Sequence, residues 1–111
     1  MSEPDRLVSV YAVFADAAEA RRIGRMMVER RLAACVNILA PCQSFYRWQG
    51  AIEEGEEVPA LFKTRAARAA ALIAAIAAAH SYAVPAIVAW EAAAAHGAYA
   101  RWVADETGPQ R

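Results

Sequence analysis

Apolar residues recur along the chain with two different spacings, and each change of spacing marks the start of a new element. Residues 7–14 (LVSVYAVF) are rich in β-branched and aromatic side chains and are apolar on both alternating faces. Such a stretch is typical of a central strand that is covered on each side. The pattern therefore predicts a β-strand as the first element after a short N-terminal segment.

Helical spacing replaces this pattern in residues 15–34. Asp16 followed three residues later by Glu19 resembles a capping box in which Asp16 is the N-cap. The apolar stripe that follows recurs at helical spacing and consists of Ala20, Ile23, Met27, Val28 and Leu32. We expect an amphipathic helix here, with the arginines of this segment mostly on its solvated face.

Alternation with a period of two begins at residue 35 and continues to residue 48. Gly50 then marks a turn, and residues 51–64 form a second extended segment, so the two segments predict a long β-hairpin. Its strands of roughly 14 residues exceed the usual length of about 5–6, and half of the hairpin would project beyond the sheet. Another copy of the chain is the simplest partner to cover it. Pro59 lacks an N–H donor, which points to an edge position or a bulge.

The second half of the chain predicts a helix, a strand and a further helix. Residues 65–80 contain no glycine or proline and consist almost wholly of strong helix formers. Residues 82–92 form a short strand that Pro85 interrupts early, and residues 96–107 form a short amphipathic helix. The larger apolar side chains of the two helices are Leu72, Ile73, Ile76, Tyr99, Trp102 and Val103.

The predicted order is β-α-β-β-α-β with an extra C-terminal helix. This is the split β-α-β, ferredoxin-like pattern of the α+β class, in which two helices cover one face of an antiparallel sheet. A chain of 111 residues is about the size of one domain, so residues 1–111 are expected to form a single unit. We expect residues 1–6 to be a flexible N-terminus and residues 107–111 a flexible tail.

Composition favours a self-associating protein over a nucleic-acid or membrane protein. The apolar fraction is 59%, but much of it is alanine, which buries little area, so the larger apolar groups are expected between subunits. Lys and Arg balance Asp and Glu to a net charge of zero, which gives no field that attracts nucleic acid. The N-terminus lacks the basic residues of a signal peptide, and no apolar run reaches the roughly 18 residues of a membrane span. We therefore expect a cytoplasmic protein with no membrane partner.

The two cysteines are expected to be free thiols. In a continuous strand Cys35 and Cys42 would lie on opposite faces and about 23 Å apart, at roughly 3.3 Å per residue. A disulfide requires a far shorter separation, although a break at Pro41 would reduce it. Cytoplasmic proteins also rarely keep disulfides.

No local motif encodes a catalytic or metal site. The chain has no glycine-rich phosphate loop and no C-x-x-C, H-x-x-x-H or H-E-x-x-H motif. A site would have to combine distant residues, and the candidates are Cys35, Asn37, Glu57, Lys63, His80 and Tyr82. Each has a structural alternative: Cys35 as an inert buried residue, Glu57 and Lys63 as solvated or ion-paired, and His80 as a group beside a helix C-terminus.

Catalysis is the weaker hypothesis for these residues. Nucleophilic attack by Cys35 would require activation by His80 and a third orienting group, and nothing in the spacing brings them together. Thiolate and imidazole are ligands that soft or borderline metals prefer, and copper leads the affinity order. We therefore expect no enzymatic activity, and metal binding is the better hypothesis if Cys35 and His80 converge.

Asn37 raises a separate question, because it is an amide within an apolar strand. The alternation places Cys35, Asn37 and Leu39 on one face, and Val36 and Ile38 on the other. We expect hydrogen bonds from the neighbouring backbone or from an adjacent subunit to hold Asn37. Cys35 and Asn37 then either line a cleft between subunits or only seal it.

Five ordered motifs identify a family resemblance over nearly the whole chain. ACVNI (34–38), SFYRWQGAIE (44–53), EVPALFKT (57–64), HSYAVP (80–85) and YARWV (99–103) resemble the CutA family of divalent-cation tolerance proteins. The resemblance implies a cytoplasmic homotrimer, similar in architecture to the nitrogen-regulatory PII signalling proteins, with the long hairpins packed between subunits. It also implies a role in tolerance and response to copper and other divalent ions, without a known enzymatic activity.

The resemblance also implies where ligands bind. Cys35 and Asn37 belong to the family's signature strand, and other signature positions around the clefts between subunits are Trp48, Glu57, Lys63, His80 and Tyr82. The implied metal ligands are His80 and Cys35, for weak binding of copper or another divalent cation that folding does not require. The alternative is a PII-like regulatory module that binds a small anionic ligand or a protein partner in the cleft, with Lys63 as the counter-charge.

Three positions depart from the family pattern. The family has proline where this chain has Ser81, glutamate where it has Ala86, and in some members cysteine where it has Ala12. The loss of the glutamate removes a carboxylate from the neighbourhood of His80. Metal binding is therefore expected to be less secure in this chain than trimerisation.

Overall fold

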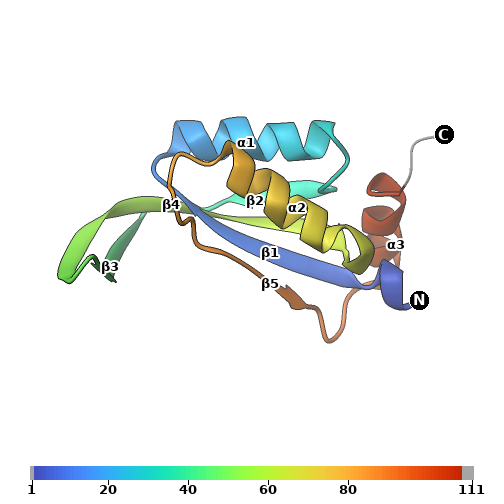
Figure 1. The fold of residues 1–111 in the computed structure, drawn as a ribbon. Coiled ribbons are helices and arrows are strands. Elements are labelled where there is room, and N and C mark those ends of the chain that lie inside the picture. Colours follow the sequence, from blue (N-terminus) through green and yellow to red (C-terminus); the bar gives the residue numbers. More distant parts are fainter. Residues whose placement is uncertain (1, 109–111) are drawn as a thin grey trace.

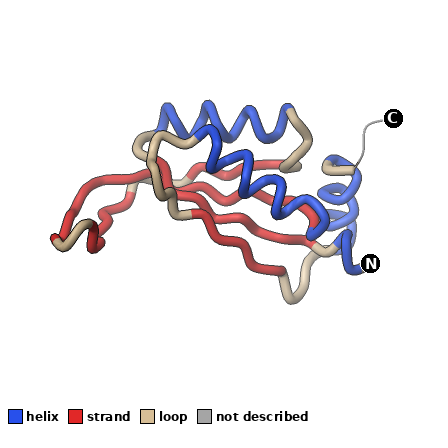
Figure 2. Tube along the Cα trace, in the orientation of Figure 1, coloured by secondary structure: helices blue, strands red, loops and turns tan. Residues whose placement is uncertain are grey.

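Two helices lie on one face of an antiparallel sheet in the computed structural model, which describes residues 2–108 (Figure 1). A third helix lies against one end of the sheet, close to the N-terminus, and Figure 2 shows the same two-layer arrangement. The elements are η1 (Glu3–Asp5), β1 (Leu7–Phe14), α1 (Ala17–Glu29), β2 (Cys35–Ile38), β3 (Cys42–Trp48), β4 (Ala51–Arg65), α2 (Ala66–Ala79), β5 (Ile87–Glu91) and α3 (Gly97–Glu106). The α+β class predicted from the sequence is confirmed.

The order of the strands follows the split β-α-β pattern. The sheet runs β2-β4-β1-β5 with every neighbouring pair antiparallel, and β3 pairs with the other half of β4. The strands β1 and β2, which α1 connects, are therefore separated by β4. In the same way β4 and β5, which α2 connects, are separated by β1. This arrangement brings α1 and α2 to the same face.

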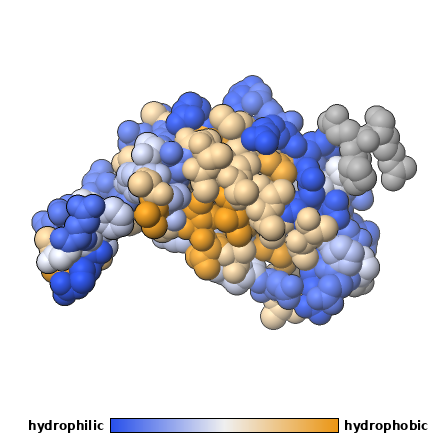
Figure 3. Space-filling view, viewed as in Figure 1, coloured by the Kyte–Doolittle hydropathy of each residue, from blue (hydrophilic) through white to orange (hydrophobic). Residues whose placement is uncertain are grey.

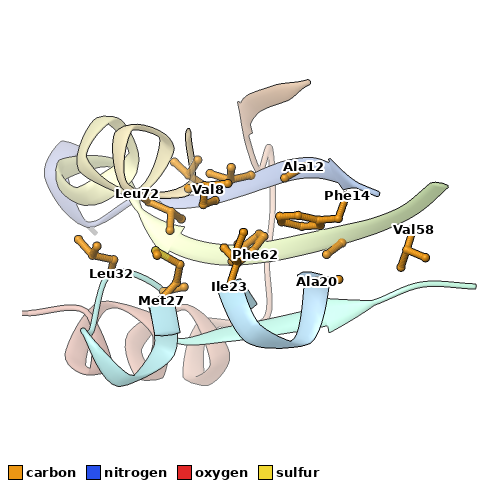
Figure 4. Packing of buried hydrophobic residues seen from close by; sticks show 14 residues of the cluster. Val8, Ala12, Phe14, Ala20, Ile23, Met27, Leu32, Val58, Phe62 and Leu72 are labelled. Carbon is orange, nitrogen blue, oxygen red and sulfur yellow. The ribbon is translucent and has the colours of Figure 1, made fainter. Parts of the chain in front are cut away.

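The core lies between the sheet and its two helices (Figure 4). On β1 and β4, Val10 is paired with Phe62 and Phe14 with Val58, and all four side chains are buried against the helices. The side chains that fill the layer from other elements are Ala20, Ile23, Met27, Leu32, Leu72 and Ile76. Burying one side chain the size of Phe, Ile or Leu contributes about 1.5–3 kcal/mol, so this layer supplies most of the burial energy of the chain.

The predicted continuous strand over residues 35–48 is wrong, because residues 39–41 separate β2 from β3. The reason lies opposite the break: Leu39 N–H donates to Pro59 O at 2.9 Å, but Pro59 has no N–H to return the second bond of that pair. The prediction of an edge position or a bulge at Pro59 is confirmed as a bulge, because residues 39–41 lie opposite only Val58 and Pro59, between the Ile38–Ala60 and Cys42–Glu57 pairs. On its other side Pro59 keeps regular register with β1.

The outer part of the hairpin projects from the body of the molecule, as the sequence predicts (Figure 1). β4 is 15 residues long, and its first seven residues pair only with β3. Gln49 and Gly50 at the tip have φ of 49° and 83°, which is the left-handed pair that a tight type I′ hairpin turn requires. Phe45 and Ile52 are 67% and 62% exposed on this hairpin.

The ends of the described chain are bound to the body of the fold. Glu3–Asp5 form a short 3-10 helix within the expected flexible N-terminus, and Asp5 lies 3.6 Å from the Arg65 guanidinium. Thr107, which was expected in a flexible tail, is fully buried and donates to Val103 O at 2.7 Å. Met1 and residues 109–111 of the two predicted segments lie outside the described residues.

The helices and the last strand follow the sequence pattern with shifted ends. α1 ends at Glu29 rather than near residue 34, because Arg31 takes a left-handed φ of 58°. β5 begins at Ile87, after Pro85, as the interruption predicts. No helix within residues 2–108 has the length and hydropathy needed to cross a membrane.

Candidate functional site

The face of the sheet opposite α1 and α2 is covered at its Leu7 end, where α3 packs, and the rest of it has no cover from residues 2–108. Side chains alternate along β1 and β5, so Tyr11, Val88 and Trp90 point away from the core layer. The rings of Tyr11 and Trp90 lie 6.2 Å apart, and Val88 and Trp90 are 51% and 49% exposed. Figure 3 looks onto the α2 side of the molecule, where apolar surface gathers in the middle, and the projecting hairpin is largely hydrophilic. We call the side of the sheet opposite α1 and α2 the open sheet face.

Three of the predicted site residues meet on the open sheet face. Cys35 pairs with Lys63 across β2 and β4, and the Lys63 Nζ donates to Asn37 Oδ1 at 3.3 Å. Within one chain a lysine side chain, not neighbouring backbone, holds Asn37, and a hydrogen bond from an adjacent subunit stays a prediction. The predicted free thiols of Cys35 and Cys42 are confirmed.

Tyr99 of α3 completes this cluster, and the sequence analysis missed it as a site residue. Its hydroxyl lies 3.3 Å from the Cys35 Sγ. Burial, together with the hydrogen bond to the thiol, raises the pKa of Tyr99 to about 12. The sequence marked Tyr99 only as an apolar helix position. The available signal was that a half-buried tyrosine requires a partner for its hydroxyl.

His80 lies away from the Cys35 cluster, and its ring is fully occupied by the backbone. Tyr82 N–H donates to Nδ1 at 3.0 Å, so Nε2 carries the proton and donates to Val13 O at 2.7 Å. The ring is 9% exposed and stacks on the core residue Phe14 at 5.1 Å. It therefore lies on the helix side of the sheet, whereas Cys35 lies on the open face.

This placement decides two hypotheses about His80 within a single chain. Neither ring nitrogen is free to bind a metal, and no group of three possible metal ligands gathers among residues 2–108. His80 also cannot activate Cys35, whose neighbour is Tyr99. The residues present in one chain therefore do not fit a metal centre or a Cys-His catalytic pair.

Glu19 is a buried carboxylate that joins two segments beside His80. Asp16 Oδ1 accepts from Glu19 N–H at 2.8 Å, which confirms the predicted N-cap. The Glu19 side chain accepts from Ala15 N–H at 3.0 Å and from Ser81 N–H at 2.8 Å. Burial alone would raise the pKa of Glu19, but the hydrogen bonds from Ser81 and Ala15 outweigh it, so the pKa is lowered. Ser81, where the family has proline, thus supplies an N–H that proline lacks.

The remaining predicted residues form a groove between the hairpin and the segment before β5. Tyr82 OH donates to Glu57 Oε2 at 2.8 Å, and Trp48 lies on the same wall of β3 as Tyr46. This groove has a volume of about 690 Å³. We call this the aromatic groove, and its lining is Val13, Ser44, Tyr46, Trp48, Glu57, Tyr82, Ala83, Val84, Pro85 and Ala86.

Lys63 does not line the aromatic groove. It lies six residues beyond Glu57 along β4, which corresponds to about 20 Å of extended strand. Burial, followed by the hydrogen bond and negative charge of Glu57, raises the pKa of Tyr82 well above its usual range. The predicted cleft residues therefore separate into two groups: Trp48, Glu57 and Tyr82 in the groove, and Cys35, Asn37 and Lys63 in the cluster.

Comparison with known proteins identifies the family. The family model described as CutA1 divalent ion tolerance protein matches residues 8–106. The divalent-cation tolerance protein CutA of Thermus thermophilus is 43% identical over 89 residues, covering 80% of this chain and 86% of that protein. The chain belongs to the CutA family of divalent-cation tolerance proteins. The names of this family describe tolerance proteins, not enzymes.

Solved CutA structures share the whole fold. The structure from Xylella fastidiosa has a TM-score of 0.90 at 34% identity, covering 93% of this chain and 99% of that one. A CutA structure from Archaeoglobus fulgidus, described as a periplasmic divalent cation tolerance protein, has a TM-score of 0.88 at 32% identity, with 92% and 99% covered. The chain spans 66% of the CutA homologue of Xenopus laevis and about half of the mouse and human CutA proteins.

Proposed function

We propose that this CutA chain acts in tolerance and response to divalent metal ions, copper among them, as a cytoplasmic homotrimer. One observation carries the proposal: residues 2–108 leave most of the open sheet face and the outer hairpin uncovered, with Val88, Trp90 and Phe45 about half exposed or more. Contiguous apolar surface of this kind marks sites of protein association. A small, alanine-rich core also gains stability when subunits share the burial of larger groups.

Sedimentation of the full chain at micromolar concentration tests the assembly, and the expected result is a trimer. Replacing Val88 with glutamate puts a charge on the open sheet face and is expected to shift the chain toward monomer. Val28→Glu is the matched control, because Val28 is 37% exposed on α1, in the helix layer away from the open sheet face, and should leave the trimer intact. A stable monomer of the native chain would overturn the proposal. Fractionation of cells that express the native chain, against compartment markers, tests the cytoplasmic location.

Metal binding is proposed to be weak and to use the Cys35 thiol of more than one subunit. The support is chemical: thiolate suits copper and similar ions, and Cys35 lies on the face proposed to meet other subunits. His80 is left out of this proposal, because both of its ring nitrogens bond the backbone of its own chain. Since one chain offers no complete ligand set within residues 2–108, the affinity is expected to depend on assembly.

Calorimetric titration with Cu(II) tests the metal proposal, with Co(II) as an optical probe of thiolate ligation. We expect saturable heat and a cobalt–thiolate absorption band in the native trimer, and loss of both in Cys35→Ser. Cys42→Ser is the matched control and should behave as the native chain. Equal titrations for the native chain and Cys35→Ser would refute the role of Cys35.

A regulatory role through ligand binding is the second candidate function, because the aromatic groove offers a concave site of the usual size. An anionic ligand lacks its counter-charge there, since Lys63 lies elsewhere. A thermal-shift screen of nucleotides, organic acids and amines against the native trimer tests this function. Absence of stabilisation by every compound would count against it.

A further inference from the structure

We propose that the aromatic groove binds an organic cation, in which an ammonium group is attached to an apolar body. This inference rests on the regulatory function proposed above and is independent of metal binding. Three aromatic side chains and one carboxylate form the groove: Tyr46 and Trp48 from β3, Tyr82 from the segment before β5, and Glu57 from β4.

The charge of the groove lining favours a cation. Glu57 is the only formally charged residue among the ten that line the groove, and no lysine or arginine lines it. One of its oxygens, Oε2, accepts from Tyr82 OH at 2.8 Å. The other oxygen, Oε1, has no hydrogen-bond partner within residues 2–108 and remains available to a ligand. A half-buried carboxylate with a free oxygen favours a positive ligand group.

The aromatic rings of the groove also favour a cation. Tyr46 and Trp48 are two residues apart on β3, so both side chains lie on the same face of the hairpin as Glu57. Tyr82 approaches from the opposite side and is fixed by Glu57 and by the His80 ring at 4.8 Å. Electron-rich ring faces attract ammonium groups, and several rings around one carboxylate suit substituted ammonium ions in particular. The remaining walls, Val13, Val84 and Pro85, are apolar and suit the body of such a ligand.

The volume and the surroundings favour this occupant over others. About 690 Å³ lies within the range of small-molecule sites, which is roughly 300–1,000 Å³. A hard divalent cation requires several oxygen ligands, and this groove has a single carboxylate. Phe45 and Ile52 lie on the other face of the hairpin from Tyr46 and Trp48, and they offer a second copy of the chain a separate apolar surface.

Binding of benzyltrimethylammonium to the native oligomer tests the proposal, with benzenesulfonate as the anionic counterpart. Indole N–H signals in NMR spectra report binding at Trp48, and titration of these shifts gives Kd. We expect Glu57→Gln to weaken binding about tenfold, because the probe has no N–H donor and its attraction to Glu57 depends on the negative charge that glutamine lacks. Trp48→Leu should weaken it about fivefold through loss of a cation–π contact. Glu54→Gln is the matched control and should leave Kd unchanged, because Glu54 lies on the other face of the hairpin from Glu57.

Four results would overturn the proposal. Benzenesulfonate binding as tightly as the cation would show that charge does not select the ligand, while the regulatory function would survive. Equal Kd values for native chain and Glu57→Gln would remove Glu57 from recognition. Failure of the native oligomer to bind the cation, when a monomeric Val88→Glu variant binds it, would show that a second copy fills the groove. Failure of both to bind it would also refute the proposal.

Discussion

Replacing Glu19 with glutamine tests whether one buried carboxylate joins the start of α1 to the segment after α2. In the native chain its side chain accepts from Ala15 N–H at 3.0 Å and from Ser81 N–H at 2.8 Å. Glutamine keeps one acceptor oxygen, but its NH2 group must then point at one of these two N–H donors. One buried N–H therefore loses its partner, and the remaining hydrogen bond loses its charge.

The expected cost follows from these two bonds. A hydrogen bond to a charged group contributes about 1.5–3 kcal/mol, and an unsatisfied buried donor costs a further fraction of that amount. We therefore expect Glu19→Gln to lower the free energy of unfolding by about 2–3 kcal/mol at pH 7. For a chain of this length that corresponds to a fall in Tm of roughly 10 °C.

Urea unfolding at one fixed protomer concentration measures this difference, because the stability of an oligomer depends on concentration. The measurement is repeated near pH 3.5. Since the pKa of Glu19 is lowered in the fold, the unfolded chain binds more protons in the acid range, and the contribution of Glu19 is lost as the pH falls. The difference between native chain and Glu19→Gln should therefore shrink on acidification.

Glu29→Gln is the matched control on the same helix. Its carboxylate lies 3.3 Å from Arg25 in a solvent-exposed pair, which contributes at most about 0.5 kcal/mol. A cost for Glu19→Gln as small as that of the control would refute the bridging role. A difference that stays constant or grows toward pH 3.5 would refute the charge argument.

Three further predictions concern stability. The native chain should lose stability above pH 10, because the pKa of Tyr99 is raised to about 12 and its neutral form is favoured in the fold. Tyr99→Phe should flatten this loss, which urea unfolding between pH 9 and 12 measures. Parallel pH profiles of stability for the native chain and Tyr99→Phe would contradict the prediction. Gly24→Ala should destabilise the native chain, because the added Cβ would lie 3.0 Å from Val36 Cγ1. In a Val36→Ala background the same substitution should stabilise the chain by about 0.5–1 kcal/mol through helix propensity. Additive free energies of unfolding in the double-mutant cycle would contradict this prediction. Phe62→Ala should cost about 3–5 kcal/mol in urea unfolding, and a cost below about 1 kcal/mol would mean that its buried site collapses around the substitution.

Local patterns predicted most of the fold because the signals that set them are local. The Asp16 cap, the alanine-rich helix and the long hairpin each depend on residues a few positions apart. The break between β2 and β3 was different, because it depends on which residue of β4 lies opposite Leu39. The register of β2 against β4 places Pro59 opposite Leu39, and the spacing of residues within one strand does not predict that register.

The candidate site was predicted only in part, for the same reason. Trp48, Glu57 and Tyr82 do meet, but the Tyr82–Glu57 bond joins residues 25 positions apart. Within one chain His80 does not meet Cys35, because its ring partner, Val13 O, lies 67 positions away in sequence and occupies a nitrogen that a metal would need. Sequence identifies which side chains can bind a metal, but their availability depends on long-range backbone contacts.

Pro59 connects the architecture of the sheet to both candidate sites. Side chains alternate along β4, so Val58, Ala60 and Phe62 enter the core while Glu57 and Lys63 take the other face. A slip of one residue would exchange these two sets and would bury both charges. Because Pro59 cannot donate, the paired edge strand must end opposite it, and this ending separates the strand that carries Cys35 from the strand that carries Trp48. The missing hydrogen bond therefore lets the outer hairpin turn away from the sheet, which creates the aromatic groove at one end of β4 and leaves the Cys35 cluster at the other.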